Sequence, residues 1–239
     1  MFFNKTKDSL LSSANSKFSI GDFQGAIKLY KEYIKKCTGE KDQNYLGALQ
    51  NLGVCHKKLA DFDIALIYYE QALDLSRKIK SAVEEASASS NIAIIYKNQG
   101  SELIKSGKLK EAKEKFTKSE ELFNQAIELD LEMDNIEGVA SSLLNLGNLY
   151  KNDFKNSQAM SVFKKSIEYS KKIDNDLILG SALCGIGNVH LQVEEYDKAI
   201  EKYQEALLIL QSTSNYDTRW LINLTQANLQ KAIQQKNSK

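Results

Sequence analysis

The chain has 239 residues, of which 42% are apolar and 26% are charged, so it can bury a core as one elongated domain or as two compact ones. Its 32 basic and 31 acidic side chains leave a net charge of +1, which gives no overall field to attract nucleic acid or an anionic membrane. No apolar stretch approaches the roughly 18 residues of a membrane span, and the apolar run at the start is too short for a secretory signal. We therefore expect a soluble, cytoplasmic protein.

The chain contains no proline and no alternating strand pattern, which predicts that it is helical throughout. In chain order, a weak first helix around Ala14 is followed by four similar segments, which begin at Asn51 (NLGVCHKK), Asn91 (NIAIIYKN), Asn145 (NLGNLYKN) and Gly185 (GIGNVHLQ). Each segment leads through a polar turn into a second helix; these second helices include the stretches from Asp22, Asp61, Ser119, Asn156 and Glu195. The pattern predicts five helical hairpins.

Small residues mark the same point of each first helix, at Ala14, Gly53, Ala93, Gly147 and Gly187, with spacings of 39, 40, 54 and 40 residues. They let the two helices of a hairpin approach closely, against Ala26, Ala65, Ala159 and Ala199 of the second helices. Aromatic residues fill the space toward the next hairpin, at Tyr30, Tyr69, Phe163 and Tyr203. The repeating unit is therefore about 40 residues long.

The third hairpin breaks this spacing by 14 residues, which is two heptads. Small and aromatic positions recur seven residues apart in it, as Ala93 and Gly100 do on the first helix and Phe116 and Phe123 do on the second. We expect each helix of this hairpin to be one heptad longer than usual and its turn to project beyond its neighbours.

The order Leu-Gly, Tyr or His, Ala, aromatic, Ala resembles the tetratricopeptide repeat over nearly the whole chain. The 40-residue unit and the stretch Leu146-Gly147-Asn148 are most similar to the Leu-Gly-Asn repeat proteins and to kinesin light chain. The resemblance implies an all-α, right-handed solenoid that forms a single domain over residues 1–239. Its expected hairpins are 7–40, 46–79, 86–133, 140–173 and 180–211, and a capping helix at 218–236 is expected to point Trp220 and Leu224 inward.

Catalysis finds little support in the residues. His56 and His190 stand where other repeats carry tyrosine, which favours packed rings over catalytic bases. Cys37, Cys55 and Cys184 are far apart, and no cluster has the spacing of metal ligands. Gly100 and Gly107-Lys108 are spaced too widely for a phosphate-binding loop. We expect no enzyme activity, no metal and no cofactor.

Asparagines recur on the face of the first helices that, in the resembled family, lines a concave groove. A carboxamide both donates and accepts, so such a ladder can bind the main chain of an extended peptide. Lysines at equivalent positions favour an acidic or phosphorylated segment, although both residue types are also common on solvated helix faces. The predicted groove residues are Asn15, Asn51, Asn91, Asn98, Asn145, Asn148, Asn152 and Asn188, with Lys57, Lys58, Lys97 and Lys151.

The sequence thus predicts a non-catalytic adaptor or scaffold that binds an extended partner segment in this groove, and neither nucleic acid nor a membrane. The alternative is a fixed structural subunit of a large cytoskeletal or ciliary assembly, held through its edges and its long third hairpin. A helical enzyme or a small-molecule sensor is the third and least supported class.

Overall fold

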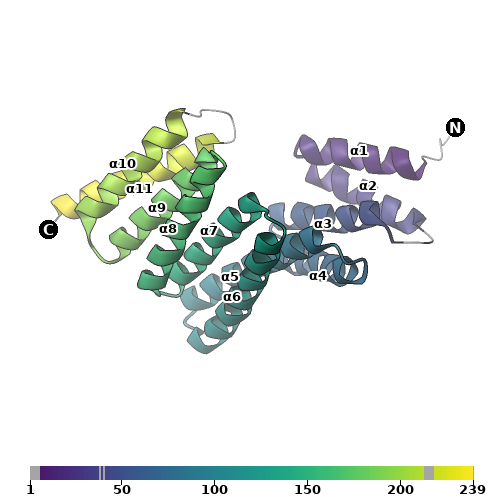
Figure 1. The fold of residues 1–239 in the computed structure, drawn as a ribbon, viewed down its shortest axis with the longest axis horizontal. Helices are drawn as coiled ribbons and strands as arrows, with labels where there is room; N and C mark the ends of the chain where they lie inside the picture. The colour runs from purple at the N-terminus through teal and green to yellow at the C-terminus, as the bar shows by residue number, and fades with distance from the viewer. Residues whose placement is uncertain (1–5, 38, 40, 213–217, 239) are drawn as a thin grey trace. The chain divides into compact units, whose positions relative to one another are not determined.

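The computed structural model describes residues 6–37, 39, 41–212 and 218–238, and these form eleven helices and no strand. The helices follow one another as antiparallel hairpins (Figure 1). The first helices of the hairpins are α1 (Lys7–Ser19), α3 (Gln43–Lys58), α5 (Ala82–Lys105), α7 (Ile136–Asn152) and α9 (Asp176–Gln192). The second helices are α2 (Phe23–Lys36), α4 (Phe62–Lys78), α6 (Leu109–Glu132), α8 (Asn156–Lys172) and α10 (Tyr196–Ser212), and α11 (Arg219–Asn237) follows them.

The chain forms two compact units, residues 1–95 and 96–239, with the boundary inside α5. In the first unit α1 packs on α2, α2 on α3, and α3 on α4. In the second unit α6 packs on α7, α7 on α8, α8 on α9, α9 on α10, and α10 on α11. This succession of neighbouring hairpins is a helical repeat solenoid, as predicted.

The small and aromatic positions of the repeat form the core. Tyr30, Tyr69, Phe163 and Tyr203 are fully buried, and so are the four alanines expected to face the first helices. At Gly147 an added Cβ would lie 2.6 Å from Cδ1 of Phe163, so this glycine allows the aromatic ring to rest directly on the backbone of α7. The close approach that the sequence predicts is therefore made against the ring of Phe163.

Most turns between helices reach a left-handed backbone without glycine. Residues with positive φ include Ala60, Phe154 and Glu194, and glycine takes this place only at Gly21 and Gly107 among the described residues. After α7, the Lys155 amide donates to the carbonyl of Tyr150 at 2.8 Å, which satisfies a carbonyl at the helix end. This Schellman-type closure explains how the helices stop in a chain without proline.

The third hairpin is longer by one heptad in each helix, as predicted. Both α5 and α6 have 24 residues, whereas α7, α8, α9 and α10 each have 17. An added Cβ on Gly100 would lie 2.5 Å from Cε1 of Phe116, so the additional layer repeats the glycine-on-ring contact of the fourth hairpin. The extra length is therefore packed as a regular layer.

The last helix differs in one respect from the expectation. α11 buries Leu221, Thr225 and Ala232, whereas Trp220 is 62% exposed and Leu224 is 47% exposed. Trp220 and Leu224 therefore do not point inward. Leu221 and Thr225 are four residues apart on one face of α11, and their burial fixes the rotation of the helix about its own axis. This rotation places Trp220 and Leu224 beside residues of α7 and α9.

Candidate peptide-binding groove

Helices α7, α9 and α11 of the second unit line a cavity of about 380 Å³. α7 contributes Ser141, Leu144, Asn145 and Asn148; α9 contributes Leu177, Ile178, Ser181, Cys184, Gly185 and Asn188; and α11 contributes Trp220, Leu221 and Leu224. We call this cavity the groove. It holds three of the twelve predicted binding residues, Asn145, Asn148 and Asn188, and no charged residue lines it.

One part of the groove is apolar and open to solvent. Trp220, Leu224 and Leu177 are respectively 62%, 47% and 38% exposed, and all three line the same cavity. Exposed large apolar side chains that gather in one concavity are typical of a protein-binding site. The sequence pattern does not reveal this feature, because a large apolar residue such as Trp220 is expected on the buried side of the last helix.

Asn145 and Asn148 form the polar part of the groove. Each donates its amide to the carbonyl four residues earlier on α7, at 3.1 Å to Ser141 and 3.1 Å to Leu144. Their carboxamide oxygens accept no hydrogen bond from any described residue. Two acceptors one helical turn apart are thus available for the backbone N–H groups of a bound segment.

Asn188 has a structural role instead. Its carboxamide oxygen accepts from the hydroxyl of Tyr203 at 2.8 Å and from the amide of Asn228 on α11 at 3.2 Å. Asn15 does the same in the first unit, where it accepts from Tyr30 at 2.6 Å, and Asn51 donates to the Tyr30 oxygen at 2.9 Å. These three asparagines therefore satisfy buried tyrosine hydroxyls.

A regular spacing, overlooked in the sequence, signals this role. Asn15 and Tyr30 are 15 residues apart, as are Asn188 and Tyr203. In the fourth hairpin the same spacing leads from Asn148 to Phe163, which has no hydroxyl. Asn148 is thus left without the tyrosine that occupies its counterparts.

In the first unit, Asn91 and Lys57 are bound to each other. The ammonium group of Lys57 donates to the carboxamide oxygen of Asn91 at 2.7 Å, and the Asn91 amide donates to the carbonyl of Ser87 at 3.0 Å. Desolvation by burial, with a smaller effect of Lys58, lowers the pKa of Lys57 to about 8. Both the oxygen and the amide of the Asn91 carboxamide therefore already have partners, whereas the sequence pattern predicts that they are available to a bound peptide.

The remaining predicted residues lie at different degrees of exposure. Asn152 donates its amide to the hydroxyl of Ser101 at 2.9 Å. Burial lowers the pKa of Lys151, whose ammonium group has no hydrogen bond or ion pair with a described residue. Lys58 is exposed, and Lys97 and Asn98 on α5 are half-buried.

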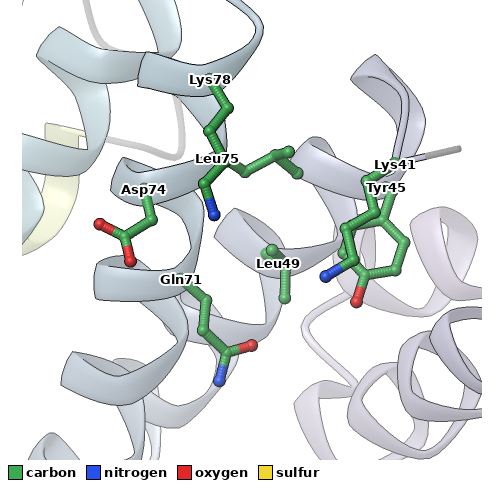
Figure 2. Close-up of a pocket in the computed structure, with 7 residues that line it drawn as sticks. All are labelled: Lys41, Tyr45, Leu49, Gln71, Asp74, Leu75 and Lys78. Carbon is green, nitrogen blue, oxygen red and sulfur yellow. The ribbon is translucent and has the colours of Figure 1, made fainter.

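The first unit carries a separate pocket of about 260 Å³. Figure 2 shows Lys41 and Tyr45 on one side of it, Leu49 between, and Gln71, Asp74, Leu75 and Lys78 of α4 on the other. None of the predicted binding residues lines this pocket, and its walls carry charges of both signs.

The ring of each histidine contacts the carboxylate of the residue five positions later. Nδ1 of His56 lies 3.2 Å from Asp61, and Nδ1 of His190 lies 2.6 Å from Glu195. His56 is also buried and stacked on Tyr68, with ring centroids 5.6 Å apart. Across the described part of the chain, no three His, Cys, Asp or Glu side chains are grouped as metal ligands would be. The two rings thus make packing and turn contacts.

The second half of the chain matches a known protein family. The sequence model described as "Soluble NSF attachment protein, SNAP" matches residues 96–222, just over half of the chain, starting where the second unit starts. A tetratricopeptide repeat model matches residues 46–79. The chain belongs to the soluble NSF attachment protein family and is built of tetratricopeptide repeats.

Curated relatives include the photosystem I assembly protein Ycf3 of Rippkaea orientalis (strain PCC 8801 / RF-1), which is 34% identical over 109 residues, 46% of this chain and 58% of that protein. Ycf3 of Cyanophora paradoxa is 31% identical over 111 residues, 46% of this chain and 60% of that protein. The chain thus spans about three-fifths of the length of these relatives. They give no support to the expected cytoskeletal or ciliary assembly.

Among solved structures, the apo form of RapI has a TM-score of 0.71 at 16% identity and covers 87% of this chain and 71% of its own. BtubC (BKLC) from P. vanneervenii has a TM-score of 0.68 at 20% identity, covering 87% and 81%. The tetratricopeptide protein TTC0263 from Thermus thermophilus has a TM-score of 0.64 at 14% identity, covering 93% and 100%. These structures share the fold.

No helix in the described part of the chain is both long enough and apolar enough to cross a bilayer.

Proposed function

We propose that the chain is a non-catalytic adaptor that binds an extended segment of a partner protein in the groove of α7, α9 and α11. One observation carries this proposal: the open carboxamide oxygens of Asn145 and Asn148 lie in the same cavity as the exposed side chains of Trp220 and Leu224. The asparagines would accept hydrogen bonds from the main chain of the segment. The apolar part would hold one of its larger side chains.

The relatives support an adaptor in a general way. The two described above are named as photosystem I assembly proteins, and a protein that assembles a complex has to contact other proteins. For the present chain, we propose only that it holds a partner protein, in the cytoplasm. A permanent structural subunit, the alternative, would bury its outer surfaces and leave the groove without a ligand.

A photo-cross-linking experiment tests the proposal. A benzoylphenylalanine residue at Leu144 in the groove should cross-link to a partner protein in cells, whereas the same residue at the exposed Lys164 of α8 should not. The Asn145→Ala/Asn148→Ala variant should bind the identified partner about 0.5–1.5 kcal/mol more weakly for each lost hydrogen bond. Asn124→Ala, on the exposed face of α6, is the matched control. Equal cross-linking from both positions, or unchanged affinity of the double variant, would favour the structural subunit.

A further inference from the structure

A second cavity, of about 390 Å³, lies within the second unit beside the turn of the fourth hairpin. Its lining residues are Ser101, Ile104 and Lys105 of α5, Lys151 and Asn152 of α7, Phe154 of the turn, and Gln192 of α9. α7 has 17 residues, and a helix of the same length that begins at Ala82, the first residue of α5, would end at Asn98. The residues of α5 after Asn98 are thus the additional heptad. One wall of this cavity is therefore made by the additional heptad of the third hairpin.

The charge of the cavity has one sign. Lys105 and Lys151 line it, and no carboxylate does. Lys105 forms an exposed ion pair with Glu102, but the ammonium group of Lys151 has no hydrogen-bond or ion-pair partner among the described residues. Desolvation lowers the pKa of Lys151, so the surroundings provide too little compensation for its charge. An anion placed here would supply that compensation.

The second cavity lies one helical turn beyond the groove on two helices. Asn152 of the cavity follows Asn148 of the groove by four residues on α7, and Gln192 follows Asn188 by four residues on α9. Asn152 is held by the additional heptad, because its amide donates to Ser101, whose hydroxyl donates to the carbonyl of Lys97 at 2.9 Å. The heptad thus fixes one side of a cationic site that continues the groove.

We propose that the lengthened third hairpin adds a subsite that binds the carboxylate of an Asp or Glu in the same extended partner segment. This inference rests on the proposed function of the groove. A carboxylate fits better than a phosphate, because Lys105 is already paired with Glu102 and Lys151 is the one cation of this lining that is unpaired among the described residues, which balances the single charge of a carboxylate but not the charge of about −2 on a phosphate. Seven residues separate Leu144 from Lys151 on α7, which is about 10 Å of helix rise or about three residues of extended peptide.

A displayed library of random twelve-residue peptides tests the subsite with the full chain as bait. Selected peptides should carry an Asp or Glu about three residues from a large apolar residue, in line with the separation above. Replacing that acid by its amide should weaken binding to the unaltered chain about tenfold, the effect of losing one charge-assisted hydrogen bond. The Lys151→Met variant should bind both peptides with the same weak affinity. Lys164→Met, an exposed lysine of α8, should behave like the unaltered chain.

Other outcomes separate the two proposals. Peptides that depend on Asn145 and Asn148 but are insensitive to the acid and to Lys151→Met would overturn the subsite and retain the groove. Selected peptides that bind equally well to the Asn145→Ala/Asn148→Ala variant would overturn the groove itself, and with it the subsite. A phosphoserine in place of the acid that improves binding tenfold or more would overturn the assignment to a carboxylate.

Discussion

The hydroxyl of Tyr203 donates a hydrogen bond to the carboxamide oxygen of Asn188, 2.8 Å away, across the two helices of the fifth hairpin. The same contact joins Tyr30 and Asn15 in the first hairpin at 2.6 Å. Phe163 and Asn148 occupy these places in the fourth hairpin, where the contact is absent because phenylalanine has no hydroxyl. One sequence feature, a recurring asparagine, therefore has two roles that depend on the residue 15 positions later.

Asn188→Leu should destabilise the protein by about 1–3 kcal/mol, because it leaves the buried hydroxyl of Tyr203 without an acceptor. Urea unfolding measures this loss. The double variant Asn188→Leu/Tyr203→Phe should recover most of it, since both polar partners are then removed. A double variant as unstable as the single one would instead assign the loss to the contact between Asn188 and Asn228.

Val54→Asn should stabilise the first unit. The hydroxyl of Tyr69 is buried without a hydrogen-bond partner, and Val54 stands 15 residues before it, where asparagine serves Tyr30 and Tyr203. A new hydrogen bond should raise the free energy of unfolding by about 0.5–1.5 kcal/mol. In a Tyr69→Phe background the same substitution should bring no gain, and an equal gain there would mean that the asparagine acts in some other way.

Gly147→Leu should cost about 1–3 kcal/mol or more through overpacking, because even an added Cβ would lie 2.6 Å from the ring of Phe163. Gly47→Ala is the matched control. Gly47 lies within α3 and an added Cβ there meets nothing within 4 Å, so alanine should stabilise by about 0.5–1 kcal/mol through helix propensity. Thermal unfolding that ranks the two variants in the reverse order would disprove the assigned packing.

Deleting residues 98–104 and 113–119 together should restore a hairpin of ordinary length. The two deletions remove Gly100 and its facing ring Phe116 as one layer, so the remaining helices should stay paired and circular dichroism should remain helical. Deleting only 98–104 should be more destabilising, because Phe116 then loses the glycine against which it packs. If the proposed subsite exists, the folded double deletion should also lose the preference for acidic peptides.

The free energy of unfolding should rise between about pH 8 and pH 9 through Lys57. Burial lowers its pKa from 10.5 to about 8 in the folded protein, so above pH 8 the unfolded chain binds the additional proton and folding is favoured as the pH rises. This rise in the free energy of unfolding should end near pH 9. There the thiol of Cys55 begins to ionise in the unfolded chain but not in the folded protein, where burial raises its pKa to about 11, and this difference opposes the effect of Lys57. Lys57→Met should make this rise smaller in urea unfolding experiments, because the lowered pKa of Lys151 contributes in the same direction and is left in place. An identical pH slope in both proteins would contradict the assignment.

The repeat pattern by itself determined the class of fold and the length of its units. Small and aromatic residues return every 40 residues because each hairpin must bury the same face against its neighbour. The order of residues along the chain is therefore enough to reveal this requirement. The two heptads in the third hairpin were readable for the same reason, since both helices had to lengthen together to keep each ring opposite a small residue.

The tertiary structure decided what the polar and exposed residues do. Asn188 and Asn148 stand at equivalent places in the repeat, yet one is bound to Tyr203 and Asn228 and the other keeps an open acceptor in the groove. Trp220 was expected inside because it is large and apolar, but the turn of α11 is set by Leu221 and Thr225 and leaves Trp220 in the groove. The hydrogen-bond partners of a side chain, and the face that a terminal helix buries, depend on which side chains meet across helices. The periodicity of a single helix does not contain that information.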